Sequence, residues 1–250
     1  MRCMFVLRFA LALLVAGCAS GFHRQALQQR LEGQPLNVSD EEIRAALEKK
    51  PQIRFPINLA VHLIADTVLS SNDVPLWDPR GPTVGWRWSQ ADVERIEQWA
   101  ESLRQAGIVS NMFVMSQLVS AGNDARSARL AGAKHGADAV LVIKGVAEVD
   151  RYVNPSAILN LLILPGFFVP ASHRDALFMM RAAMWDVANE FLYLSVDAEG
   201  EARMKGPTLR IRDSDAIDSA KSLALQSFEK EFLKRMHALK DAAAERADAH

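Results

Sequence analysis

Histidine is the residue type in this chain best suited to acid–base or metal chemistry. The six histidines are His23, His62, His135, His173, His237 and His250. None falls in HExxH spacing, and none has a second ligand-type residue in a diagnostic register. His62 lies inside an apolar run, where a histidine is expected to be structural. We therefore expect no metal site at these residues.

Motifs of nucleophilic or phosphate chemistry are also missing from the sequence. It contains no GxSxG elbow, no P-loop and no GxGxxG after a predicted strand. We therefore expect a protein that is not an enzyme and has no catalytic residues. Because Ser/His/Asp triads can be scattered along a chain, an enzyme with a dispersed active site remains an alternative.

The thiol of Cys18 offers a different chemistry, because it directly follows the small residues Ala16 and Gly17. Two arginines near the N-terminus and an apolar run over residues 9–15 precede it. This is the layout of a secretory signal, too short to span a bilayer as a stable anchor. Residues 14–18 resemble the lipobox of bacterial lipoproteins. The alternative is an ordinary signal peptide with a coincidental cysteine.

The lipobox resemblance implies that residues 1–17 are a signal peptide, cleaved between Gly17 and Cys18. Cys18 would then carry a diacylglycerol and an N-acyl chain, and no other cofactor is expected. Each buried methylene adds about 0.8 kcal/mol, so several chains anchor a protein essentially permanently. Ala19 stands where an Asp is the inner-membrane retention signal of enteric bacteria. The resemblance thus implies a protein anchored in the outer membrane and facing the periplasm.

Charge and composition limit the remaining partners. Without Arg2 and Arg8 the chain keeps 27 basic and 30 acidic residues, and no basic stripe is present. Nucleic acid is therefore not an expected partner. Half of the residues are hydrophobic, which is enough for one core. We expect a lipidated tether with a short helix over 18–50, a single periplasmic domain over 51–240 and a C-terminal tail over 241–250.

Two segments are candidate interaction surfaces. The predicted loop 71–88 contains Trp77, Trp86 and Trp88, and Trp is enriched at binding hot spots. The alternative is that these indoles pack back onto the sheet. The run 157–170 has one polar side chain and includes Leu162, Phe167 and Phe168. Such a run between strands favours contact with a membrane or a partner, and the alternative is a buried cover of the core.

The elements that must position these residues follow from hydrophobic periodicity and capping signals. A capping box at Ser39 opens a short helix, and Asn189 is expected to take the positive φ of a hairpin turn. Gly107 and Gly136 are expected to end helices. Strands are predicted at 57–64, 108–118, 137–149, 175–187 and 191–203, and helices at 90–106, 125–135 and 215–246. The order predicts an α/β (mixed α+β) fold with a mixed sheet of about five strands, packed helices and a long C-terminal helix.

A more specific resemblance rests on three short stretches. Residues 136–143 read Gly-Ala-Asp-Ala-Val-Leu-Val-Ile, and the predicted hairpin carries Ala-Met-Trp-Asp-Val at 183–187 and Phe-Leu-Tyr-Leu at 191–194. This combination resembles the curli-secretion and LpoB-type envelope lipoproteins, which share a TolB-amino-terminal-like domain. With the run at 164–170 it is more similar to the rhombotarget lipoproteins. The resemblance implies a periplasmic domain on an outer-membrane anchor. It does not indicate which activity the protein has.

The function expected from these observations is that of a non-enzymatic binding or accessory protein of the cell envelope. Its expected contacts are the membrane, through the lipid anchor, and a periplasmic or outer-membrane protein. A subunit of an oligomeric secretion or envelope assembly is the second alternative beside the dispersed-site enzyme.

Overall fold

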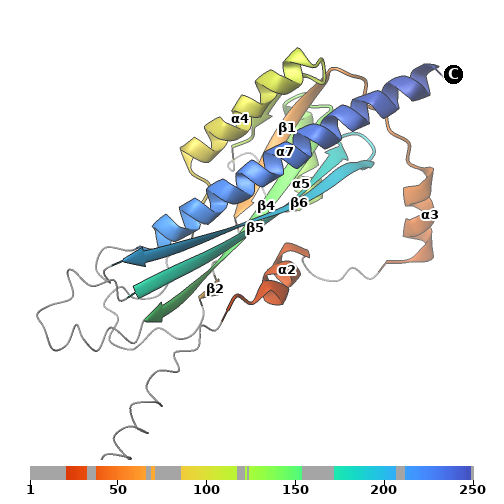
Figure 1. Cartoon of the computed structure of the whole chain (residues 1–250). Coiled ribbons are helices and arrows are strands. Elements are labelled where there is room, and N and C mark those ends of the chain that lie inside the picture. Colours follow the sequence, from red (N-terminus) through yellow and green to blue (C-terminus); the bar gives the residue numbers. More distant parts are fainter. Residues whose placement is uncertain are drawn as a thin grey trace, which may run out of the picture.

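The computed structural model describes residues 21–32, 38–65, 69–70, 86–116, 122, 124–153, 172–206 and 212–248. A mixed sheet forms the centre of the molecule, with long strands that run diagonally across Figure 1. Its main strand order is β3-β1-β4-β5-β6, and the short β2 pairs beside β4. The strands are β1 (Ile57–Ala65), β2 (Leu69–Ser70), β3 (Val109–Val114), β4 (Ala139–Val153), β5 (Ser172–Asp186) and β6 (Leu192–Gly206).

The sheet combines a parallel and an antiparallel half. β1 pairs in parallel with both β3 and β4, through connections that contain α4 (Gln90–Gln105) and α5 (Ala125–Lys134). β4, β5 and β6 form an antiparallel meander. The long α7 (Asp213–Asp248) follows. The predicted α/β fold with a mixed sheet and a long C-terminal helix is confirmed.

Local signals in the sequence explain where the helices begin and end. Ser89 caps α4 in a capping box with Asp92, and Asp124 caps α5. Gly107 and Gly136 follow the ends of these helices with φ of 64° and 68°, as predicted. A residue with a side chain is strained in this region, whereas glycine is not.

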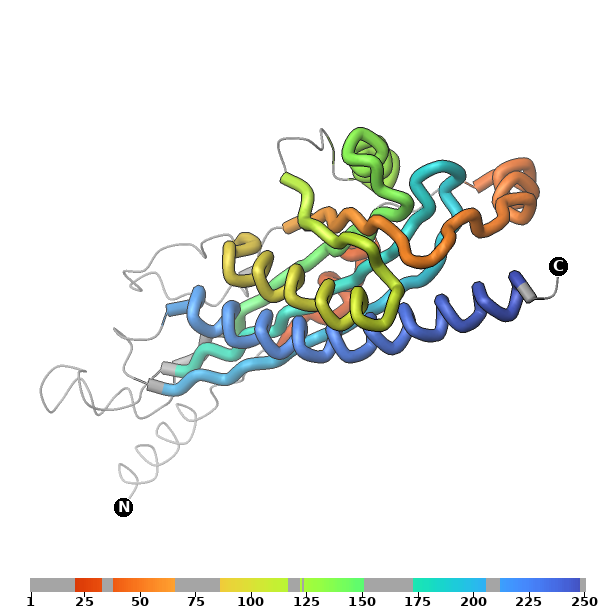
Figure 2. Tube along the Cα trace, turned by 90° about the horizontal axis from the view of Figure 1, so that it is seen from above, coloured from red at the N-terminus to blue at the C-terminus, as the bar shows by residue number. Residues whose placement is uncertain are grey.

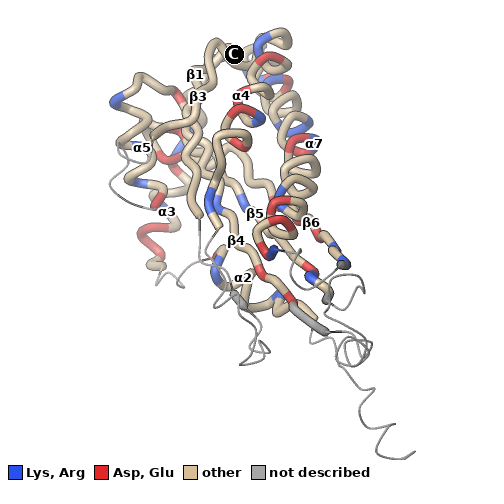
Figure 3. The backbone as a smooth tube through the Cα atoms, turned by 90° about the vertical axis from the view of Figure 1, so that its left-hand side faces the viewer, with Lys and Arg blue, Asp and Glu red and all other residues tan. Residues whose placement is uncertain are grey.

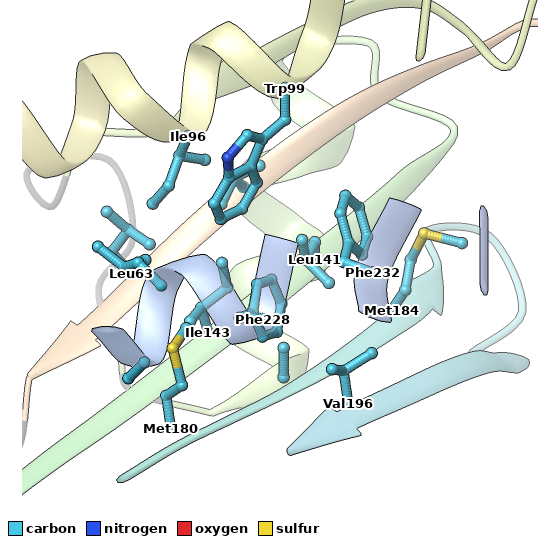
Figure 4. Packing of buried hydrophobic residues seen from close by; sticks show 14 of the residues in the cluster. Leu63, Ile96, Trp99, Leu141, Ile143, Met180, Met184, Val196, Phe228 and Phe232 are labelled. Carbon is cyan, nitrogen blue, oxygen red and sulfur yellow. The ribbon is translucent and has the colours of Figure 1, made fainter. Parts of the chain in front are cut away.

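One face of the sheet carries the main core beneath α4 and α7, which lie side by side in Figure 2. Trp99 of α4 packs against Phe228 and Phe232 of α7, with ring centroids 5.6 and 6.1 Å apart. Figure 4 shows these rings gathered around side chains of the sheet, such as Leu141. The charges of α7 are of both signs and form no single-sign stripe (Figure 3). The apolar stripe predicted for this helix faces the core, because its members, such as Ala224, Phe228 and Met236, are buried in the main cluster.

The other face of the sheet is covered by two short helices. α5 packs on β4 with small residues such as Ala128 and Ala131. α2 (Arg24–Glu32) places Leu27 and Leu31 on Val146. Because residues 19–36 have no sustained apolar stripe, the sequence predicted a tether there; two buried leucines are enough to dock this helix. Residues 24–32 of the segment expected as a tether thus form a helix that packs on the sheet, whereas residues 18–20 and 33–37 lie outside the described residues.

Smaller differences from the predictions lie at element ends. The short helix α3 (Asp40–Glu48) has its predicted capping box at Ser39. In the β5–β6 turn, Glu190 has the positive φ of 64° that was predicted for Asn189. The Asn189 side chain instead accepts from the Phe191 N–H and donates to the Lys50 carbonyl. The C-terminal helix, predicted over 215–246, spans Asp213–Asp248 as α7 and so includes most of the stretch expected as a tail over 241–250.

Candidate functional site

Two buried carboxylates mark one end of β4. Side chains alternate along a strand, so Val146, Glu148 and Asp150 all point toward the α2 side of the sheet. Glu148 is fully buried and Asp150 is 4 % exposed. A buried carboxylate is strongly destabilising unless hydrogen bonds satisfy it. The stability of this region therefore depends on the hydrogen-bond partners of these two carboxylates.

The segment before α2 supplies partners for both carboxylates. The Gly21 N–H donates to Asp150 Oδ2 at 3.1 Å, and the His23 N–H donates to Glu148 Oε2 at 2.7 Å. His23 Nδ1 lies 2.7 Å from the other oxygen of Glu148. This hydrogen bond, with the negative charge of Glu148, raises the pKa of His23. We call these four residues the N-terminal clamp.

Further contacts extend the clamp along α2. Arg24 pairs with Glu199 at 2.5 Å and with Glu201 at 3.5 Å, both on β6. The Lys144 ammonium donates to the carbonyl of Arg30. With the buried leucines, these contacts hold the whole segment 21–32 against β4, β5 and β6.

A groove lies at the opposite end of the sheet, between the extended segment 50–55 and the end of α7. Its volume is about 830 Å³. Tyr193 fixes its position: the hydroxyl donates to Asp186 Oδ2 at 2.5 Å and accepts the N–H groups of Gln52 and Ile53 at 3.0 and 3.1 Å. Burial and the bond to Asp186 raise the pKa of Tyr193 to about 12. The hydroxyl is thus occupied in holding the groove wall.

The groove is cationic. Lys50, Arg54 and Arg246 line it, and its lining includes no Asp or Glu. Among the described residues, none of the three forms an ion pair; Arg246 donates only to the Ala242 carbonyl of its own helix. We call this hollow the cationic groove.

The clamp and the groove are separated by most of the length of the sheet. Asp150 pairs with Asp175 on β5, and Asp175 pairs with Arg203 on β6. Tyr193 lies ten residues from Arg203 on the same strand, which corresponds to about 33 Å at the usual rise per residue.

A buried ion pair connects the helices over the main core. Lys221 of α7 lies 2.6 Å from Asp92, the capping-box residue of α4, and 3.2 Å from Asp218. Its ammonium lies 6.0 Å from the Trp86 ring and 3.4 Å from the Arg87 carbonyl, to which it donates. These contacts are explained by packing, because a buried lysine needs such partners.

The two described tryptophans of the predicted interaction loop point inward. Trp86 and Trp88 are partly buried on the main core, and Trp86 lies edge-on to Phe178 at 4.7 Å. The Trp88 indole donates to the Ile64 carbonyl at 3.1 Å. This is the alternative that the sequence left open, in which the indoles pack onto the sheet.

His62 is also buried, and burial lowers its pKa.

The remaining predicted site residues lie outside the described residues. They are Gly17 and Cys18 of the lipobox and Trp77, Leu162, Phe167 and Phe168 of the candidate interaction surfaces. In the part of the chain that is described, no three His, Cys, Asp or Glu side chains gather as metal ligands. No described helix is both long enough and apolar enough to cross a membrane.

Sequence reasoning did not find the clamp or the groove. A signal for the clamp was present, since Glu148 and Asp150 alternate with the apolar residues Ala147 and Val149 within a predicted strand. The groove had no such signal, because its walls are about 190 residues apart in the sequence and charged residues at such positions are usually only solvated.

No protein-family model and no curated protein match the chain. Solved structures with some likeness include a protein described as a neuraminyllactose-binding hemagglutinin homolog from Helicobacter pylori, with 10% identity over 79% of this chain and 95% of that one and a TM-score of 0.33. Protein XCC0632 from Xanthomonas campestris has 11% identity, coverage of 78% and 91%, and a TM-score of 0.37. The LpoB C-terminal domain from Salmonella enterica has 10% identity over 71% of this chain and 98% of that one, with a TM-score of 0.26. Likeness at this level assigns neither a family nor a function to the chain.

Proposed function

We propose that this protein is an outer-membrane lipoprotein that faces the periplasm and acts as a non-enzymatic binding or accessory protein of the cell envelope. In this proposal residues 1–17 are removed and acylated Cys18 anchors the chain, as the lipobox resemblance implies. The N-terminal clamp is the observation that carries the proposal furthest, because it connects the anchor directly to the sheet.

The clamp sets the distance between the anchor and the folded domain. Gly21 is bound to Asp150 and follows Cys18 by three residues. Three extended residues span at most about 11 Å. An acyl-anchored Cys18 therefore keeps the clamp end of the sheet next to the bilayer. The cationic groove then faces the aqueous periplasm, about 33 Å farther along the strands.

The lining of the cationic groove favours binding over catalysis. An enzyme site needs convergent acid, base or nucleophilic groups. The titratable side chains of this lining are Lys50, Arg54, Arg246 and Tyr193. The three cations are donors without an adjacent base, and Tyr193 keeps its proton up to a pKa of about 12. Such a set can attract an anion but offers no general base.

The anchor is tested by Cys18→Ala, with Cys3→Ala as the matched control because Cys3 lies in the proposed signal. We expect the Cys18 variant to remain unprocessed or to become soluble, and the Cys3 variant to fractionate with the outer membrane. A processed Cys18→Ala protein that is still tightly bound to the outer membrane would contradict the proposal.

The orientation is tested by energy transfer to acceptor lipids in vesicles. Acylation blocks the thiol of Cys18, so a single dye can be placed on Arg203→Cys at the clamp end or on Ala247→Cys at the groove end. We expect clearly stronger transfer from position 203. Equal transfer from both positions would show that the clamp does not hold the domain in this orientation.

A further inference from the structure

We infer that the cationic groove binds an acidic segment of a soluble protein partner, which also inserts an apolar side chain between the two walls. The groove itself is independent of how the chain is anchored. Only its orientation toward the periplasm rests on the proposed function.

The first wall is an extended segment with two distinct rows. Lys50, Gln52 and Arg54 are exposed, whereas Pro51, Ile53 and Phe55 are half-buried. This alternation is that of an extended chain. Ile53 and Phe55 pack on the main core, and Tyr193 holds the backbone at Gln52 and Ile53. Residues of both rows line the groove, so this wall contributes cations as well as a fixed apolar surface.

The second wall is the last part of α7. Leu239, Ala243, Arg246 and Ala247 line the groove and lie on one face of the helix, at the spacing i, i+4, i+7 and i+8. The two alanines leave room between the helix and Phe55. Arg246 adds its charge at the outer end. The second wall therefore repeats the combination of a cation and apolar surface.

The charges favour an acidic occupant. Three cations line the groove without an acidic residue among them, although the chain as a whole has a formal charge of −1. Within the described residues these cations have no carboxylate partner. A complementary charge on a partner steers its approach and fixes its register. An acidic segment would supply the missing carboxylates.

The apolar walls distinguish a protein segment from a simple polyanion. A polyanion would use the cations alone and leave Ile53, Phe55 and Leu239 uncovered. Burying a Leu or Phe side chain contributes about 1.5–3 kcal/mol. A volume of about 830 Å³ accommodates such a side chain together with flanking residues, and it lies within the range of ordinary ligand pockets. The bilayer is a poorer occupant, since the groove lies at the end of the sheet away from the clamp.

The experiment uses the full chain as it is purified from its host, in nanodiscs of neutral phosphatidylcholine if Cys18 is acylated and in buffer if it is not. The probe is a fluorescent decapeptide with two central phenylalanines flanked by glutamates, and binding is followed by anisotropy. Two comparison peptides carry lysines in place of the glutamates, or glutamate at every position. We expect the acidic phenylalanine peptide to bind most tightly, and binding to weaken as salt is added, because the contacts include exposed charges.

The groove variant is Arg54→Glu with Arg246→Glu, and its matched control is Lys134→Glu with Lys230→Glu. Both pairs change the net charge equally, and Lys134 and Lys230 are exposed residues of α5 and α7 outside the groove lining. We expect the groove variant to bind about ten-fold more weakly, which corresponds to about 1.4 kcal/mol, and the control to bind like the unchanged protein.

Several results would overturn the inference. The first is the absence of binding at millimolar concentrations of the acidic phenylalanine peptide. The second is an equal loss of affinity for this peptide in the groove variant and in the control variant. The third is an affinity for the lysine peptide that equals the affinity for the acidic one. Equal affinity for the all-glutamate peptide would show a simple polyanion site. If the groove variant instead detaches the Cys18→Ala chain from vesicles of anionic lipid, the groove contacts a membrane. None of these results depends on signal cleavage or membrane fractionation. The peptide experiment therefore tests the groove, and the Cys18→Ala experiment tests the anchor, independently of each other.

Discussion

The Tyr193 hydroxyl lies 2.5 Å from Asp186 Oδ2 across the turn that joins β5 and β6. The other oxygen of Asp186 accepts the N–H groups of Ala188 and Asn189 within that turn. The same hydroxyl accepts the N–H groups of Gln52 and Ile53. One phenol group thus connects the hairpin to the first wall of the groove.

Removing this hydroxyl should loosen the groove. In Tyr193→Phe, the N–H groups of Gln52 and Ile53 and one oxygen of Asp186 lose this partner. The Gln52 group is exposed to solvent, whereas the bonds to Ile53 and Asp186 are part-buried, and an unsatisfied buried group is destabilising by about 1–3 kcal/mol. Urea denaturation at pH 7 should show a loss in this range. Hydrogen exchange should also become faster at residues 52 and 53. A variant with unchanged stability and exchange would show that the bond contributes nothing.

The pH dependence of Tyr193 provides a second test. Its pKa is raised from 10.0 to about 12 in the folded protein, so the folded state holds the proton more tightly than the unfolded state does. This stabilisation is fully present below pH 10 and is lost as pH rises through about 12. Lysines also titrate in this range, so the measurement is the difference between the unchanged protein and Tyr193→Phe. That difference should shrink from pH 9 to pH 12, and a constant difference would contradict the assignment.

The N-terminal clamp should weaken as pH rises. Glu148 raises the pKa of His23, so the protonated imidazole is favoured when the clamp is closed. Its contribution is fully present below the ordinary histidine pKa of 6.5 and is lost as pH rises through the higher folded value. Hydrogen exchange of residues 24–32, corrected for the intrinsic rate, should therefore be slower at pH 5.5 than at pH 8.

Glu148→Gln should remove most of this pH dependence, because the amide bears no charge. Glu199→Gln is the matched control, since Glu199 pairs with exposed Arg24 and exposed pairs contribute at most about 1 kcal/mol. If Glu199→Gln and Glu148→Gln alter the exchange of α2 to the same extent, the buried carboxylate has no special role.

Two glycines should respond very differently to alanine. A Cβ at Gly200 of β6 would lie 2.2 Å from the Ala220 carbonyl oxygen and 2.5 Å from the Ala224 nitrogen of α7. The backbone of α7 would have to move, and overpacking of a core is destabilising by about 1–3 kcal/mol or more. Gly136 has no atom within 4 Å of an added Cβ, so only its positive φ matters, at about 1 kcal/mol. Thermal melts that reverse this order would contradict the close approach of α7 to β6.

The run 157–170 lies outside the described residues, and its role as an interaction surface remains a prediction. The strands that flank it end beside the clamp, because Val153 pairs with Ser172 three residues beyond the Asp150–Asp175 pair. Replacing Leu162 and Phe167 by Ser should leave the urea melt almost unchanged and reduce association with a partner or membrane. A loss of several kcal/mol, as for buried Leu and Phe, would instead make these residues part of the core.

The sequence predicted those parts of the fold that depend on local signals. Capping residues and periodic apolar positions located α4, α5 and α7, and strand propensity located the main strands. α2 was missed because a helix of nine residues with two buried leucines has almost no periodic signal. The groove was missed for a different reason: Arg54 and Arg246 line the same groove only because of the tertiary fold, and nothing local distinguishes them from solvated arginines.

The clamp and the groove lie at opposite ends of β4, β5 and β6, and this has a mechanical consequence. A pull between an anchored N-terminus and a partner held in the groove would act along the strands. The backbone ladders of β4–β5 and β5–β6 would then be loaded in shear, so that many hydrogen bonds share the force. The clamp joins the chain to the sheet through three hydrogen bonds and would yield first. Release of α2 would next require its two buried leucines and the ion pairs of Arg24 to separate from the sheet, and the chain before α3 would then extend while the sheet stays intact.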